Sequence, residues 1–191
     1  MCALTFDDGP DVRATNRLLD FLAERRILAT FCVIGANILA PGGADLLRRT
    51  VADGHTLGNH TTSFADMGEW APEAIEADLR ENLRIIRATI GDDAYPVPYF
   101  RAPNGNWGKS RPVAQSLGMQ SLAVTNTIED WNTQDVPTLA DNLRVAMRPG
   151  ELVLAHDGGG DRNGTVDAII EVVGERLSEG WRFTLPSDGE R

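Results

Sequence analysis

The chain has 191 residues, of which 42% are hydrophobic and 24% are charged. These values are ordinary for a globular protein and exclude a disordered or fibrous class. Acidic residues outnumber basic ones by 28 to 18, giving a formal net charge of −10, whereas a nucleic-acid-binding protein usually carries the opposite sign. No apolar run in the sequence reaches the ~20 residues of a membrane span. We therefore expect neither nucleic acid nor a membrane span.

The length predicts a single domain over residues 1–191. Met1 leads directly into an apolar run, without the basic and apolar regions of a signal peptide. Two interpretations stay open: a cytoplasmic protein made without a signal, or a secreted protein of which this chain is the trimmed catalytic domain. Cys2 and Cys32 lie in apolar, strand-like runs, where cysteine usually acts as a small buried hydrophobe.

Short apolar runs alternate with amphipathic stretches along the whole chain. The alternation predicts a parallel sheet of about seven strands covered by helices, either an open doubly wound sheet or a small, incomplete barrel. In such folds the chemistry lies beyond the carboxyl ends of the strands. In chain order, the predicted elements are the strand Cys2–Phe6, the helix Asp11–Arg26, the strand Leu28–Ile34, the helix Glu73–Ile90, the strands Pro98–Arg101 and Ser121–Thr125, the helix Leu139–Met147, the strand Glu151–Ala155, the helix Val166–Leu177 and the strand Trp181–Leu185.

Two adjacent carboxylates, Asp7 and Asp8, follow the first predicted strand and precede a Gly-Pro turn. Adjacent side chains on an extended segment point in opposite directions, so one carboxylate would face a pocket while the other holds a cation. Like charges this close raise the pKa of one group unless a cation relieves them. Taken alone, the same four residues are also typical of a solvated turn.

The chain has three histidines. His60 heads a run of hydroxyl residues and suits a metal ligand or a proton carrier, whereas we expect His55 to be structural. His156 ends an apolar strand, where it is placed to act as a general acid, with Leu154 lining a pocket floor. The glycines that follow His156 lack the Lys-Ser/Thr of a phosphate-binding loop.

Two further segments carry candidate residues. Arg101 closes a predicted strand, where a guanidinium can hold a carboxylate in a bidentate pair; the alternative is a surface salt bridge. Asp130 could orient another group while Trp131 packs against a sugar, and the alternative is a capping loop. Trp107 and Tyr99 could also stack on sugar rings, although packing explains aromatic residues as easily.

Taken in order, these segments resemble the motifs of the polysaccharide deacetylase (NodB-homology) family of carbohydrate esterases. The resemblance runs from the first residues to about Leu185 and implies a distorted, incomplete (β/α) barrel with about seven parallel strands. It also implies hydrolysis of N- or O-linked acetyl groups on a carbohydrate of the chitin, peptidoglycan or xylan type. The five matching segments are Thr5–Pro10, Gly58–Thr61, Arg101–Gly105, Asp130–Trp131 and Leu154–His156.

The resemblance implies a role for each matching side chain. Asp7 would be the base that activates a metal-bound water, with Arg101 holding it in place. Asp8 and His60 would bind a divalent ion, zinc in the first place, with cobalt or manganese as alternatives. His156 would protonate the leaving amine or alcohol. This division assigns the base to a carboxylate and the acid to an imidazole.

The chain departs from the family pattern at three positions. Phe64 stands where the family has a second histidine, so the metal would lose a ligand and bind weakly unless Asp66 or another group replaces it. Thr127 replaces an acidic residue, which predicts a weaker carboxylate network around His156. Asn104 replaces an aromatic residue, which predicts an altered substrate surface.

Three hypotheses follow. The first is a metal-dependent carbohydrate deacetylase. The second is a diverged hydrolase of the same fold that acts on a small amide or cyclic ureide. The third is a catalytically impaired carbohydrate-binding relative, which the presence of Asp7, Asp8, Arg101 and His156 disfavours.

Overall fold

The computed structural model describes residues 1–186, so residues 187–191 of the predicted domain lie outside the described residues. One sheet runs in the order β5-β4-β3-β2-β1-β6, with β7 paired to the first residues of β1. All the pairings are parallel, as predicted. The strands are β1 (Cys2–Asp7), β2 (Thr30–Val33), β3 (Thr56–Asn59), β4 (Tyr99–Phe100), β5 (Gln120–Ser121), β6 (Leu152–His156) and β7 (Phe183–Thr184).

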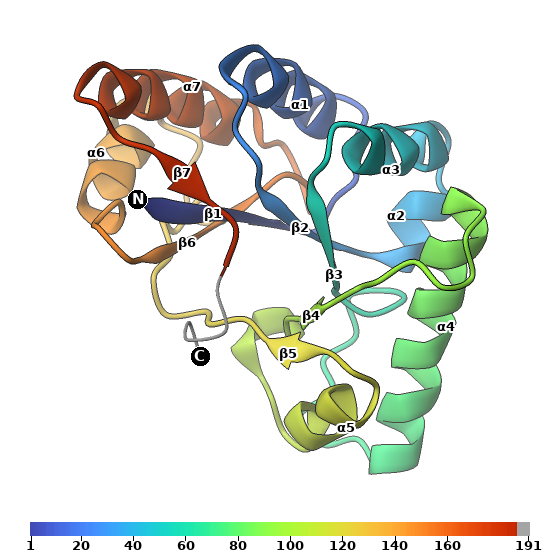
Figure 1. Ribbon diagram of the computed structural model, residues 1–191. Helices are drawn as coiled ribbons and strands as arrows, with labels where there is room; N and C mark the ends of the chain where they lie inside the picture. The colour runs from blue at the N-terminus through green and yellow to red at the C-terminus, as the bar shows by residue number, and fades with distance from the viewer. Residues whose placement is uncertain (187–191) are drawn as a thin grey trace.

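The helices lie around the outside of a curled sheet (Figure 1). This arrangement confirms the distorted, incomplete barrel and not the open doubly wound sheet, because the strands curve around a common interior instead of forming a flat layer between helices. The helices are α1 (Ala14–Arg25), α2 (Gly35–Leu39), α3 (Gly43–Ala52), α4 (Pro72–Ile90), α5 (Ser110–Ser116), α6 (Val136–Ala146) and α7 (Asn163–Ser178), with a 3-10 turn at Pro103–Gly105.

The core forms where the helices cover the sheet. All residues of β1 are buried, as is usual for a parallel strand covered on both faces. Leu4 and Phe6 of β1 belong to one large apolar cluster with Leu18 and Leu22 of α1. Within residues 1–186, no helix combines the length and the hydropathy needed to cross a lipid bilayer. The rigid core therefore fixes the positions at which the strands end.

Element bounds differ from the predicted ones where side chains or pairing partners decide them. The first helix begins at Ala14, and in the turn before it the Asp11 carboxylate accepts hydrogen bonds from the backbone N–H groups of Arg13 and Ala14. The predicted strand Ser121–Thr125 is reduced to Gln120–Ser121, since the chain leaves the sheet soon after the N–H of Leu122 donates to the Phe100 carbonyl.

Four elements, α2, α3, β3 and α5, had no counterpart in the sequence prediction. Strand β3 has a single apolar side chain, Leu57, so no alternation marks it. It fits between β2 and β4 partly because Gly58 has no side chain: a Cβ there would lie 2.8 Å from the sulfur of Cys32. Tertiary contact thus decides this strand, which positions His60.

Candidate active site

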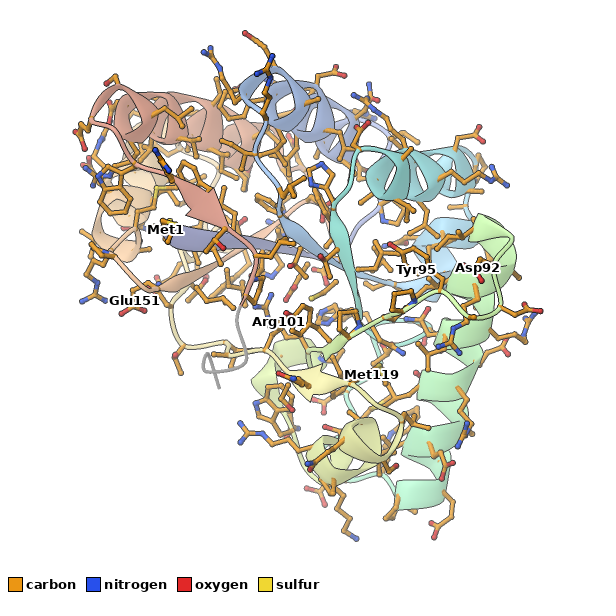
Figure 2. The ribbon with its side chains drawn as sticks, in the orientation of Figure 1. Met1, Asp92, Tyr95, Arg101, Met119 and Glu151 are labelled. Carbon is orange, nitrogen blue, oxygen red and sulfur yellow. The ribbon has the colours of Figure 1, made fainter. Side chains whose placement is uncertain are left out.

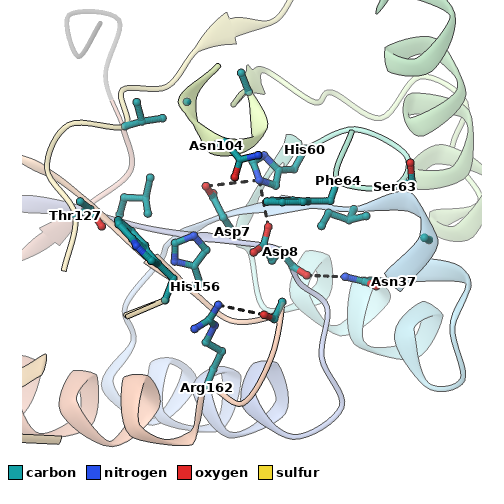
Figure 3. A pocket seen from close by; sticks show the side chains of 18 residues that line it. Asp7, Asp8, Asn37, His60, Ser63, Phe64, Asn104, Thr127, His156 and Arg162 are labelled. Atoms are coloured by element: carbon teal, nitrogen blue, oxygen red, sulfur yellow. Dashed lines mark hydrogen bonds and ion pairs between the residues drawn. The ribbon is translucent and has the colours of Figure 1, made fainter. Parts of the chain in front are cut away.

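The candidate catalytic side chains meet at the carboxyl ends of the strands, as predicted. Asp7 ends β1 and His156 ends β6, and the register of these neighbouring strands pairs the two residues directly. His60 follows β3 and lies beside Asp7 and Asp8 (Figure 3). Together these residues line a cavity of about 750 Å³, a size typical of sites for drug-sized ligands.

Asp7 is held by a buried arginine. Arg101, which is fully buried, lies in the interior of the molecule (Figure 2), and its Nη1 donates to Asp7 Oδ1 at 2.6 Å. Its Nη2 donates to Thr5 Oγ1 at 2.8 Å, so the guanidinium is fixed at two points on β1. Burial raises the pKa of Asp7, but the charges of Arg101, His60 and His156 outweigh it and lower that pKa below its usual value. Asp7 therefore stays ionised at neutral pH.

Asp8 also points into the cavity, contrary to the expected opposite orientation. Its φ of 72° breaks the extended geometry of β1, so the alternation of side chains along a strand no longer applies. Asp8 Oδ1 lies 3.3 Å from His60 Nε2, and Asp7 Oδ2 lies 3.9 Å from the same nitrogen. The two carboxylates and one imidazole thus form a single cluster.

A backbone carbonyl sets the orientation of the His60 ring. Its Nδ1 lies 2.7 Å from the carbonyl oxygen of Arg101, which can only accept, so Nδ1 carries the hydrogen and Nε2 faces the carboxylates. Burial lowers the pKa of His60, but the charges of Asp7 and Asp8 and its hydrogen bonds outweigh burial and raise it. A ring held in this tautomer presents the lone pair that a metal ligand needs.

Asp8 and His60 fit a divalent ion as a pair. Asp8 Oδ1 is buried and has no hydrogen-bond partner within the described chain, although buried carboxylate oxygens normally have one. Its 3.3 Å separation from His60 Nε2 suits two ligands that each lie ~2.0–2.1 Å from one tetrahedral ion. A cation between the two atoms would therefore satisfy both.

A third side-chain ligand is missing. Within residues 1–186 no group of three or more His, Cys, Asp or Glu side chains is arranged to hold a metal ion. Phe64 lines the cavity, with its ring centroid 5.8 Å from that of His60. Asp66 does not replace the ligand, because its Oδ1 accepts from Asn106 and from the N–H of Gly68, and Asp66 does not line the cavity.

His156 is paired with Asp130. His156 Nδ1 lies 2.7 Å from Asp130 Oδ1, while the backbone N–H of His156 and the hydroxyl of Thr165 donate to Asp130 Oδ2. Burial lowers the pKa of His156, but the hydrogen bond and charge of Asp130 outweigh it and raise that pKa. Asp130 thus reaches the imidazole directly, while the weaker carboxylate network expected from Thr127 stays a prediction.

The glycines after His156 allow close packing against the first loop. A Cβ on Gly159 would lie 2.4 Å from Asp8 Oδ2, and one on Gly158 would lie 2.1 Å from the Asp8 carbonyl oxygen. The carboxyl group of Asp157 likewise occupies the space that a side chain on Gly9 would need. Burial, with the charges of Asp8 and Asp7, raises the pKa of Asp157 to about 7, despite a hydrogen bond from Thr15. These glycines therefore allow the backbone to pack closely against the carboxylates.

The predicted substrate-binding residues divide into two groups. Trp131, Leu154 and Asn104 line the cavity. Trp107 does not; its ring packs on Phe100 and under the guanidinium of Arg111. Tyr99 does not line the cavity either, and its hydroxyl donates to the Pro186 carbonyl. Both aromatic side chains thus contact other parts of the protein outside the cavity, in line with the packing alternative.

Several cavity residues were not singled out from the sequence. Arg162 is buried, and its guanidinium donates to the carbonyl oxygens of Asp130, Gly158 and Gly159. Asn37 donates to the Asp8 carbonyl at 2.7 Å. Neither position had a local signal, because each is brought to the cavity by a helix start or by loop packing. His55, by contrast, is structural as expected: its Nδ1 accepts from the Ala29 N–H in the core.

Comparison with known proteins identifies the family. The family model described as polysaccharide deacetylase matches residues 1–122. The chain is 33% identical to a chitooligosaccharide deacetylase of Rhizobium leguminosarum bv. trifolii, with 96% of this chain and 89% of the relative covered. The chain belongs to the polysaccharide deacetylase family.

Two further relatives cover almost all of the chain. A peptidoglycan-N-acetylglucosamine deacetylase of Bacillus cereus is 29% identical, with 97% of this chain and 86% of the relative covered. The solved structure of a family 4 acetyl xylan esterase from Clostridium thermocellum, in complex with a cobalt ion, has a TM-score of 0.84 at 28% identity and covers 96% of this chain and 87% of its own. Both likenesses extend through the strands that carry the cavity.

Proposed function

We propose that this protein removes N- or O-linked acetyl groups from a carbohydrate by metal-assisted hydrolysis. One observation carries the proposal: Asp7 and His156 stand at paired positions of β1 and β6 in one cavity, and each is hydrogen-bonded to a buried side chain of opposite charge, Arg101 and Asp130. The pKa of Asp7 is lowered and that of His156 is raised. The Arg101 charge favours the ionised form of Asp7, and the Asp130 carboxylate favours the protonated form of His156. Such a pair in one cavity is the arrangement that acid–base hydrolysis needs.

The roles follow from these environments. Asp7 takes a proton from the attacking water, because its ionised Oδ2 faces the cavity and its Oδ1 is held by Arg101. His156 gives a proton to the leaving nitrogen or oxygen, and its hydrogen bond to Asp130 keeps the ring oriented. Arg101 and Asp130 are thus positioning residues. Trp131 and Leu154 form cavity walls against the substrate.

Asp8 and His60 would hold the divalent ion, with zinc proposed first and cobalt or manganese as alternatives. When bound, such an ion polarises the acetyl carbonyl and makes water more acidic. The cobalt ion in the acetyl xylan esterase structure supports this proposal of a divalent ion. With two protein ligands instead of the usual three, the affinity for the ion is expected to be low.

The relatives point to the substrate class. They are named for chitooligosaccharide, for peptidoglycan N-acetylglucosamine and for acetyl xylan, so we propose an acetylated oligo- or polysaccharide. These names give no support to the alternative of a small amide or cyclic ureide. The complete set of Asp7, Arg101, Asp130 and His156 also disfavours a protein that only binds carbohydrate.

Acetate release tests the proposed function directly. The purified protein, supplied with zinc or cobalt, is expected to release acetate from acetylated chitooligosaccharides or from acetylated xylan. Release should stop after exhaustive chelation and return when the ion is added back. Release that continues in metal-free protein would contradict the metal role, and no release from either substrate would contradict the function.

Replacing Asp130 by asparagine is expected to shift the alkaline limb of the pH–rate profile to lower pH. His156 must be protonated to act as an acid, and the Asp130 carboxylate raises its pKa against the effect of burial. Without that charge the pKa of His156 falls, so the protonated form is lost at a lower pH, and kcat is expected to fall by about 10²–10⁴-fold. The profile of kcat against pH measures both effects.

Asp141 provides the matched control for this prediction. It is an exposed aspartate on α6 that pairs with Arg144, and it does not line the cavity. Its replacement by asparagine should leave the alkaline limb in place. If the two variants have the same profile as the parent protein, the Asp130–His156 pair does not set the acid step.

A further inference from the structure

Phe64 is an exposed aromatic side chain that contacts His60, one of the proposed metal ligands. It is one of the few large hydrophobic side chains that remain exposed in the described chain, at 40%, and it lines the cavity (Figure 3). Resting on the proposed function, we propose that Phe64 is a binding platform for a sugar ring that is linked to the acetylated residue. The ligand class is an oligosaccharide of at least two linked sugars, held through the apolar face of one ring.

Simple space filling does not account for Phe64. If the Phe64 ring only filled the space of the histidine found here in the family, we would expect it to be buried, because burial of an aromatic ring is strongly favourable. Instead its edge-to-face contact with His60, at 5.8 Å and 62°, leaves much of the ring facing the cavity. The backbone is also held at a φ of 60°, a conformation that is a genuine outlier for a bulky residue. Such strain is typical of functional sites.

A second aromatic ring stands beside the other imidazole. Trp131 contacts His156 edge-to-face at 5.6 Å and 85°, and it is 51% exposed. His60 Nε2 lies 3.9 Å from Asp7 Oδ2, and His156 pairs with Asp7 in the register of β1 and β6. Each imidazole near the proposed base therefore has an exposed aromatic ring against it. The cavity between them therefore offers two apolar faces together with the polar catalytic groups, which is how sites for amphipathic ligands are built.

The size of the cavity favours a linked sugar over a single acetyl-bearing unit. Its volume of about 750 Å³ lies in the upper part of the ~300–1,000 Å³ range of ligand sites. Asn37, Ser63 and Asn104 also line it, so hydroxyl and amide groups of a sugar would meet hydrogen-bonding partners around the aromatic faces. Exposed apolar side chains rimmed by polar ones mark interaction sites.

The test compares three variants by calorimetric titration with triacetylchitotriose and with N-acetylglucosamine, in the presence of a chelator to prevent turnover. Phe64→Leu keeps an apolar side chain but loses the flat ring, and it is expected to weaken trisaccharide binding about three- to tenfold. Phe64→Tyr keeps the ring and should retain most of the affinity. Trp70→Leu is the matched control, since Trp70 is similarly exposed at 37% but does not line the cavity.

The outcomes separate this inference from the proposed function. A larger loss for the trisaccharide than for the monosaccharide in Phe64→Leu, absent in Trp70→Leu, supports the platform. Unchanged trisaccharide affinity in Phe64→Leu, in a protein that does release acetate, overturns the platform alone. A parent protein that neither binds the trisaccharide nor releases acetate overturns both. Thermal melting of each variant shows whether a loss of affinity reflects unfolding.

Discussion

The Asp7→Asn variant is expected to release acetate about 10²–10⁴-fold more slowly than the parent protein, the range for loss of a general base. Asparagine has nearly the same shape as aspartate, but it cannot accept the proton of the attacking water. The effect should fall on kcat, because the Asp7 carboxylate acts in the chemical step and the cavity walls are unchanged. Initial rates of acetate release across substrate concentrations measure it.

Stability must be measured in the same variant, because Asp7 is also the partner of a buried charge. The Arg101 guanidinium is fully buried and donates to Asp7 at 2.6 Å, and removing one partner of such a pair costs about 3–5 kcal/mol. The amide oxygen of asparagine can still accept this hydrogen bond, which reduces the loss. A folded Asp7→Asn variant with parental activity would contradict the role of Asp7 as the base.

Arg101→Lys serves as a companion to this variant. Lysine keeps the positive charge but has a single ammonium group in place of the two terminal nitrogens of the guanidinium. It therefore cannot donate to Asp7 and to Thr5 in the same geometry as Arg101 does. We expect lower activity than in the parent protein but more than in Asp7→Asn, since the base itself is retained. Equal activity in Arg101→Lys and the parent would show that the orientation of the carboxylate is unimportant.

Phe64→His is expected to raise the affinity for zinc or cobalt by about tenfold or more, equivalent to about 1.4 kcal/mol. The change would add a third protein ligand next to Asp8 and His60. Position 64 suits histidine, because its φ of 60° is several-fold more common for histidine than for a bulky apolar residue. Calorimetric titration of the chelated protein with each ion gives the dissociation constants.

Phe64→Leu is the control for metal binding, since leucine provides no ligand and should leave the affinity for the ion unchanged. If Phe64→His binds the ion no better than Phe64→Leu, then position 64 does not face the ion. The same histidine would remove the aromatic platform, so tighter metal binding should be accompanied by weaker oligosaccharide binding. Opposite changes in the two affinities would show that the residue at position 64 favours either metal binding or oligosaccharide binding.

Helices with local end signals were predicted closely. The observed α4 begins at Pro72 and is followed by Gly91 at a φ of 83°, and both residues mark helix ends through their own backbone preferences. Strand β3, with four residues, and helix α2, with five, were missed because they are too short to show a periodic pattern. Their structure comes from pairing and packing with segments far away in the sequence, which no local pattern records.

The sequence alone determined that Asp7, Asp8 and His156 follow predicted strands, and thus that they gather at one end of the sheet, because parallel strands all end on the same side. The strand before His60 was not predicted, and its pairing with β2 and β4 brings His60 to the same end. Only the tertiary structure decided how those side chains point. The turn at Asp8, the contact of Asp130 with His156 and the packing of Trp107 away from the cavity all depend on neighbours distant in the sequence. Periodicity and end signals act over a few residues, whereas side-chain orientation is set by whatever the fold brings alongside.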